Sequence, residues 1–239
     1  MSELFKAALL EKAAALSEED LQLINRQALR ELKAEEVFTF RLAACDDQID
    51  RDHERFTEAC LEQMAQLYVG KPVLKDHLWS AGVQTARVYA AQVEVQGDAH
   101  RLVLRCYMPR TEGTAETIAA IESGMLRECS VGVVVGRVTC SICGANQLDT
   151  LCKHMGGREY DGQVCHFDLD APRDAYEVSL VAVPAQRSAG IIKSKRYGGG
   201  APENPPGGEP GSDTWQDEAL LELEKSRFME VTSNETQAD

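Results

Sequence analysis

Apolar and polar residues alternate in several short stretches in the middle of the chain, a period typical of half-buried β-strands. β-branched residues are frequent in these stretches, and the turn "GDA" separates two of them. A shorter buried strand is expected within "KPVLKDHLWSAG" (71–82). The main strands are predicted at 36–46, 86–96, 100–108, 128–140 and 175–185.

Other segments carry apolar residues at helical spacing. The N-terminal segment is rich in Ala, Leu, Glu and Lys, and Ser17 is placed as an N-cap before an acidic first turn. "TEACLEQMAQLYV" (57–69) predicts a helix that Gly70 ends. "TAETIAAIESGM" (114–125) predicts another, with Thr114 at its cap. The pattern thus predicts an α+β domain with antiparallel strands and few helices.

The composition changes after Lys195, where "GGGAPENPPGGEPGSD" offers no core-forming residues and predicts a flexible linker. Beyond it, "TWQDEALLELEKSRFMEV" predicts a short amphipathic segment, which either docks a partner or serves as a solubilising tail. We therefore divide the chain into an N-terminal helical segment (1–35), a globular domain (36–195) and a linker with a tail (196–239).

The chain is acidic, with 39 Asp and Glu against 25 Lys and Arg and a net charge of −14. Because Lys and Arg provide most of the affinity for phosphate backbones, we expect no nucleic-acid partner. An acidic chain is also repelled by anionic membranes, and charged residues interrupt the apolar N-terminal stretch "LFKAALLEKAAAL". A soluble, intracellular protein without a membrane partner is expected.

Half of the eight cysteines lie close together, which in a reducing compartment favours metal binding over disulfides. Within residues 140–166, a Cys-x-x-Cys-Gly turn is followed by Cys-x-His. Thiolates and imidazole at this spacing suit tetrahedral Zn²⁺, and a full protein ligand set predicts a structural ion. Cys165 is an alternative fourth ligand, and reduced thiols without metal are the alternative reading. The predicted zinc ligands are Cys140, Cys143, Cys152 and His154.

The stretch "MLRECSVGVVV" places Ser130 at the head of a predicted strand. It is either an ordinary strand residue or a nucleophile, and a nucleophilic serine needs a base within hydrogen-bond reach, usually a histidine. Among the five histidines, His77 in "GKPVLKDHLWS" is the one that neither a polar turn nor the cysteine cluster explains. The residues alone leave open whether Ser130 and His77 meet.

Several motifs occur in a familiar order: "DRDHERF", "YVGKPVLKDHLWS", "ARVYAAQVE", "IAAIESGMLRECSVGVVV" and "YEVSLVAVPAQRSAGI". Together they resemble the prohead serine proteases of tailed bacteriophages, a family similar in fold to the herpesvirus assembly proteases. The resemblance covers roughly residues 38–193. It implies a closed antiparallel β-barrel surrounded by helices, to which this chain adds the Cys/His-rich insertion (140–166) and the tail.

The resemblance also implies roles for individual residues. His77 matches the catalytic histidine and Ser130 the nucleophile, and Glu177 in "YEVSLVAVPA" is our candidate for the carboxylate that orients His77. A solvent-facing strand residue is the alternative reading of Glu177. No cofactor is expected for catalysis.

The function expected from this resemblance is a serine endopeptidase that processes capsid-protein and scaffold precursors during phage head maturation. It would act in the host cytoplasm, inside the assembling procapsid, with the major capsid protein and the scaffold protein as substrates. Self-cleavage and a homo-oligomer are compatible with this reading. The alternative function is a non-catalytic procapsid assembly module with a zinc-stabilised binding domain.

Overall fold

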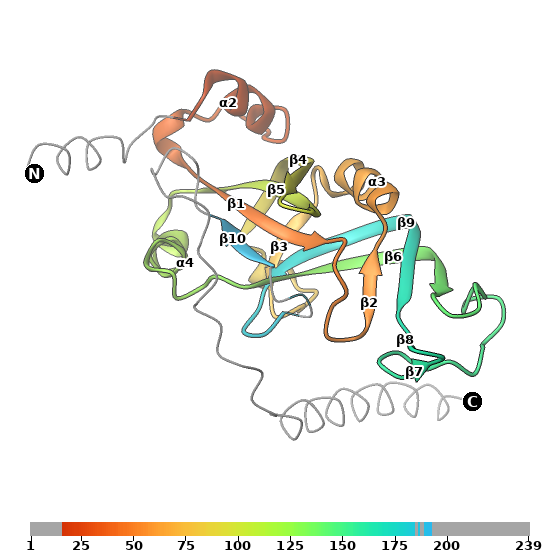
Figure 1. The fold of residues 1–239 in the computed structure, drawn as a ribbon. Coiled ribbons are helices and arrows are strands. Elements are labelled where there is room, and N and C mark those ends of the chain that lie inside the picture. Colours follow the sequence, from red (N-terminus) through yellow and green to blue (C-terminus); the bar gives the residue numbers. More distant parts are fainter. Residues whose placement is uncertain (1–15, 185, 187–188, 193–239) are drawn as a thin grey trace, which may run out of the picture. The chain divides into compact units, whose positions relative to one another are not determined.

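A computed structural model describes residues 16–184, 186 and 189–192 of the chain (Figure 1). The fold is mixed α/β, built on one large sheet. The predicted linker and tail and the helix expected over residues 1–15 lie outside the described residues. The helices, including two short 3₁₀ turns, are α2 (Glu18–Asn25), η2 (Ala34–Glu36), α3 (Glu58–Tyr68), η3 (Ala81–Val83) and α4 (Glu112–Ser123). The strands are β1 (Val37–Asp46), β2 (Glu54–Phe56), β3 (Pro72–Lys75), β4 (Ala86–Gln96), β5 (Ala99–Pro109), β6 (Cys129–Cys140), β7 (Glu159–Tyr160), β8 (Gln163–Val164), β9 (Phe167–Leu180) and β10 (Gly190–Ile192).

The large sheet has eight strands in the order β10-β1-β5-β4-β3-β9-β2, with β6 paired to β9. Strand β9 has two occupied edges. Strand β6 runs antiparallel along one of them, and β2 and β3 pair with opposite ends of the other, both parallel to β9. In Figure 1, β6 and β9 lie side by side across the molecule.

The predicted closed antiparallel barrel is therefore wrong. The sheet is open, because closure would need a ladder between β10 and β6, and in the described residues these two segments meet only at the bridge between Glu128 and Gly190. Strand β10 is three residues long, too short to pair with both β1 and β6 over any length. The parallel pairs with β9 also make the sheet mixed. Three α-helices accompany it in the described part of the chain, fewer than a surrounding layer requires.

The main strand and helix predictions are confirmed, with shifted boundaries. Ser17 caps α2, but this helix ends at Asn25, since the Asn25 side chain exchanges two hydrogen bonds with the backbone of Leu32 and closes a loop instead. Helix α4 is capped by Thr111, and Thr114, predicted at the cap, lies at its third position. Strand β9 begins and ends earlier than the predicted strand 175–185.

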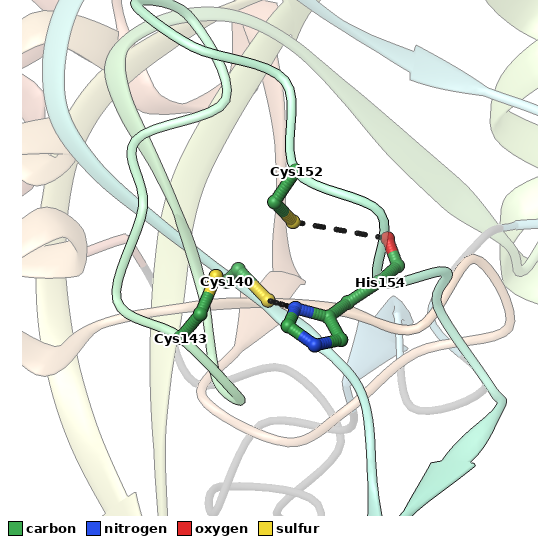
Figure 2. A group of neighbouring side chains, drawn as sticks. All are labelled: Cys140, Cys143, Cys152 and His154. Atoms are coloured by element: carbon green, nitrogen blue, oxygen red, sulfur yellow. Dashed lines mark hydrogen bonds between the residues drawn. The ribbon is translucent and has the colours of Figure 1, made fainter.

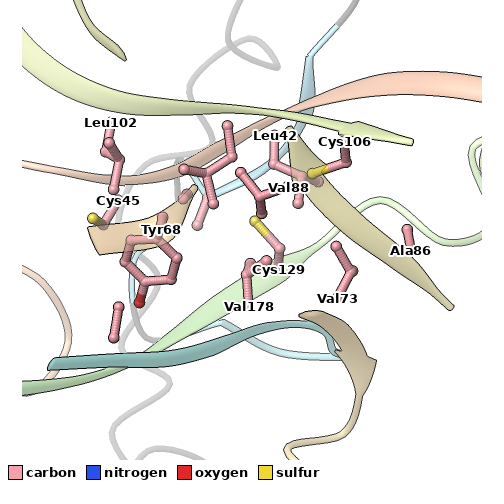
Figure 3. Close-up of a cluster of buried hydrophobic side chains, with 14 of the residues drawn as sticks. Leu42, Cys45, Tyr68, Val73, Ala86, Val88, Leu102, Cys106, Cys129 and Val178 are labelled. Carbon is pink, nitrogen blue, oxygen red and sulfur yellow. The ribbon is translucent and has the colours of Figure 1, made fainter. Parts of the chain in front are cut away.

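Helix α3 packs against β4, β5 and β9 and buries its apolar face in the core. Figure 3 shows part of this core, with Leu42, Val88 and Val178 among the labelled side chains. Four of the cysteines are buried in this core as the composition suggested: Cys45, Cys60, Cys106 and Cys129. The Tyr68 ring lies among them, and its hydroxyl donates a hydrogen bond of 3.1 Å to the carbonyl oxygen of Gly132 on β6. The core thereby fixes the position of β6. None of the helices in the described ranges is long and apolar enough to cross a membrane.

Candidate active site and metal cluster

The strand pair β6–β9 places the predicted site residues on one face. Cys129, Val131, Val178 and Leu180 turn toward the core, so the residues between them face the other way. Ser130 pairs with Ser179, and Gly132 pairs with Glu177. Residues directly opposite in an antiparallel pair share a face. Ser130 therefore lies on the same face as the Glu177 carboxyl group.

His77 reaches this face from the end of β3. After Lys75 the chain turns sharply, with Asp76 and His77 at φ angles of 54° and 53°, a left-handed conformation that costs most residues about 1–3 kcal/mol. The turn brings the His77 Nδ1 atom to 2.8 Å from Glu177 Oε1. The backbone N–H of His77 donates to Ser179 Oγ at 3.0 Å. The unfavourable backbone is thus held by contacts with β9.

Glu177 is buried, with only 2% of its surface exposed, so the reading of a solvent-facing strand residue is wrong. Its second oxygen accepts a 2.6 Å hydrogen bond from the Ser179 hydroxyl, so each carboxylate oxygen has a donor. The hydrogen bond to Glu177 raises the pKa of His77 above its ordinary value, against the opposing effect of partial burial, and the charges of Glu177 and Asp76 raise it further.

Gly132 makes room for this carboxylate. A Cβ atom at Gly132 would lie 3.3 Å from Cδ and 3.5 Å from Cγ of Glu177, and closer still to Oε1. Because Gly132 has no side chain, the Glu177 carboxylate can lie directly against β6.

The Ser130 hydroxyl is not engaged by any side chain or backbone group of the described residues. Among the described residues it has no hydrogen-bond partner, and no hydrogen bond joins it to His77, whose Nε2 atom is also free. Ser179, by contrast, is fully buried and already bonded to both His77 and Glu177. Of the two facing serines, Ser130 is the one available for chemistry.

Ser179 was missed by the sequence analysis, although "EVS" contains the signal. Residues at i and i+2 of a strand share a face, so a serine two residues after Glu177 is well placed to bond its carboxylate. His100 binds the Asp47 carboxylate at 2.8 Å, and His166 lies in the cysteine-rich insertion.

The insertion forms the second candidate site (Figure 2). Cys140 ends β6, and the turn that follows contains Gly144 at a φ of 72°, with the Gly144 N–H bonded to the Cys140 carbonyl. The ligand atoms of Cys140, Cys143, Cys152 and His154 all lie within 4.8 Å of one another. The predicted four residues are thus brought together, in an arrangement that could hold a metal ion.

The geometry fits such an ion, and the pKa values of two of the three thiols, Cys140 and Cys152, lie below the ordinary value, while hydrogen bonds to these two neighbours help to raise the pKa of Cys143. A tetrahedral zinc site has ligand atoms about 3.7 Å apart, and Cys140 Sγ lies 3.6 Å from His154 Nδ1. Burial raises the pKa of the Cys140 thiol, but hydrogen bonds from the N–H groups of Cys143 and Ile142, together with those from the Cys152 and Cys143 thiols, outweigh it, so the net pKa lies below the ordinary value. A lowered pKa favours the thiolate, which is the form that binds metals.

Neighbouring residues hold the ligands in place. The His154 ring packs edge-on against Tyr160 at a centroid distance of 4.6 Å, and the Tyr160 hydroxyl accepts the Met155 N–H at 3.0 Å. Gln147 Nε2 donates to Cys152 Sγ at 3.3 Å. Such outer contacts are typical of metal ligands.

Cys165, the alternative fourth ligand, lies outside this group. Its sulfur is 3.9 Å from Cys140 Sγ, but it does not approach all the other ligand atoms, and burial raises the pKa of its thiol to about 11. The geometry favours His154 as the fourth ligand.

Comparisons of this chain with family models, with curated proteins and with solved structures find no match.

Proposed function

We propose that this chain is a serine endopeptidase with Ser130 as nucleophile, His77 as general base and Glu177 as the carboxylate that orients the base. The observation that carries the proposal is the 2.8 Å contact between His77 Nδ1 and Glu177 Oε1, on the face that also presents Ser130. With Nδ1 engaged, Nε2 is left for the serine proton.

The chemistry follows from this order of residues. The Ser130 Oγ atom attacks the substrate carbonyl carbon while its proton passes to His77 Nε2. Collapse of the tetrahedral intermediate breaks the C–N bond, and the same proton goes to the leaving amine. A water molecule, deprotonated by His77, then hydrolyses the ester and restores Ser130. The Glu177 carboxylate stabilises the imidazolium in both halves.

The free Ser130 hydroxyl requires one adjustment during this reaction, a hydrogen bond to His77 Nε2. Catalytic hydrogen bonds are often long in the absence of substrate and form when it binds. His77 keeps 43% of its side chain exposed, which gives a substrate access to the free nitrogen.

The proposed substrates are the precursors of the major capsid protein and of the scaffold protein of a tailed phage, cleaved inside the procapsid. This part rests on the resemblance of the five motifs to prohead proteases. We further propose that Cys140, Cys143, Cys152 and His154 bind a structural Zn²⁺. When bound, the ion would hold the insertion folded, and with four protein ligands it has no position for substrate.

Co-expression with the capsid-protein precursor tests the proposal. The wild type should shorten the precursor, and Ser130→Ala should leave it uncut while the variant folds normally. Ser123→Ala is the matched control, since Ser123 is an exposed serine at the end of α4. Cleavage that continues in Ser130→Ala would rule out this nucleophile, and an uncut precursor with all three chains would favour the assembly module.

A further inference from the structure

An apolar pocket opens next to the His77–Glu177 pair. Its volume is about 330 Å³, and its walls come from β3, from the segment around η3 and from β9. Pro72, Leu74 and Ala81 supply apolar walls, and the pocket ends at Glu177. Among the described residues that line it, Glu177 alone is charged, and its two oxygens are already bonded to His77 and Ser179. Ser80 and Gln84 add neutral polar groups, and the rest of the free surface is mainly apolar.

Two aromatic rings frame this pocket. Trp79 and Tyr176 lie 5.2 Å apart between ring centroids, tilted by 56°. Their exposed fractions, 73% and 42%, are high for large rings in contact. Both rings line the pocket. Exposed aromatic residues next to a pocket are typical anchors for a bound chain.

A bulge in β9 aims Tyr176 at this pocket. Gly132 pairs with Glu177 and Val133 with Ala175, so Tyr176 is an extra residue without a partner on β6. Ala175 and Val178 both face the core. In a regular strand, residues three apart would face opposite ways, so the bulge turns Tyr176 and Glu177 outward together. A local irregularity next to the candidate triad thus places an aromatic wall beside the base.

We infer that this pocket binds an apolar side chain of the polypeptide substrate, close to the bond that Ser130 attacks. The inference rests on the proposed function. The pocket lies at the low end of the range of small-molecule sites, about 300–1,000 Å³, which suits one large side chain. Without a free charged group on its walls, the pocket favours Leu, Met or Phe over charged residues, whose burial without a partner is costly.

The test uses the full chain and two probes. A fluorophosphonate reports whether Ser130 is a reactive nucleophile, and it needs no side-chain pocket. A peptide library with every residue type at every position, read by mass spectrometry, reports the side chains preferred around the cut. The wild type should react with the fluorophosphonate and prefer an apolar side chain at one position.

The variants separate the two proposals. Trp79→Ala should lose about tenfold or more in kcat/KM toward the preferred peptides, as expected for an aromatic anchor, and should lose the preference, while fluorophosphonate labelling stays unchanged. Trp79→Phe should recover most of the preference. Val95→Ala removes another exposed apolar side chain, one that does not line the pocket, and should change neither readout.

Each outcome has one reading. A wild type that does not react with the fluorophosphonate overturns the proposed function and this inference with it. A wild type that reacts, but cleaves without an apolar preference or cleaves no peptide, overturns the pocket alone. The pocket is also overturned if Trp79→Ala keeps the preference.

Discussion

Gly132→Ala tests the arrangement of the candidate site without any assumption about catalysis. The new methyl group would overlap the Glu177 carboxylate, with contacts of 3.3 Å to Cδ and 3.5 Å to Cγ and a shorter one to Oε1. The carboxylate is the flexible end of a side chain, but it cannot move freely, because His77 and Ser179 hold both of its oxygens. The overlap is at Oε1, the oxygen that His77 binds, so the substitution displaces the whole carboxylate, and the buried hydrogen bond from Ser179 to Oε2 is broken with it.

The expected cost follows from that bond. A hydrogen bond to a charged group contributes about 1.5–3 kcal/mol. The bond to His77 is partly open to water and is left out of the sum. We expect the free energy of unfolding to fall by about 2–3 kcal/mol, which corresponds to a decrease in Tm of roughly 4–12 °C for a chain of this size.

Thermal and urea unfolding provide the assay, with a matched control and a double-mutant cycle. Gly113→Ala makes the same change on the exposed side of α4, where the nearest atom, Thr111 Oγ1, is 3.8 Å away, and should stabilise by about 0.5–1 kcal/mol because alanine is the better helix former. In a Glu177→Ala background the obstacle is gone, so Gly132→Ala should cost less than about 0.5 kcal/mol. An equal cost in both backgrounds would refute the reasoning.

Three further predictions concern the base, its support and the metal. If the proposed mechanism holds, kcat/KM should rise with pH through a midpoint above 6.5, because Glu177 raises the pKa of His77 and only neutral imidazole accepts the serine proton; Glu177→Gln should lower this midpoint. The same raised pKa stabilises the fold below pH 6.5, a contribution lost as the pH rises through the folded-state pKa, so a stability curve without this slope would contradict the His77–Glu177 contact. Ser179→Ala should lower kcat with little change in KM, and the midpoint of the pH dependence of kcat/KM should shift downward. Ser179→Thr, which keeps the hydroxyl, should recover most of the rate. If the midpoint does not change in Ser179→Ala, Ser179 has only a structural role. Wild type and Cys165→Ala should contain about one zinc per chain by elemental analysis, whereas Cys143→Ser should lack it and melt at a lower temperature; zinc-free wild type, prepared without chelators, would exclude the metal.

Much of the local structure could be predicted from the sequence, because strong periodic signals dominate there. Alternating residues gave β1, β4, β5 and β6, and the Cys-x-x-Cys-Gly turn gave the group of three cysteines and a histidine that could hold a metal ion. The strands β2 and β10 were missed, since three residues carry no measurable period.

Whether the sheet closes into a barrel could not be predicted, because closure depends on pairing between strands far apart in sequence. The motifs suggested a barrel, yet β10 is too short to form a ladder with β6. The same limit applied to the site. The burial of Glu177 and the role of Gly132 arise from the register between β6 and β9, which no local pattern specifies.

The hairpin formed by β6, the insertion and β9 also determines how the residues of β6 and β9 are paired. Its closed end is the pair Cys140–Phe167, and its open end carries Ser130 opposite Ser179, roughly 33 Å away along β6 at about 3.3 Å per residue. A slip of one residue between the strands would turn Ser130 toward the core and Cys129 outward. The cysteine cluster includes Cys140, the last residue of β6, and the insertion that carries it leads the chain back into β9. This cluster therefore fixes the register of the strand pair at its closed end. Ser130 and Glu177, near the open end, share a face only when this register is kept along the whole strand pair.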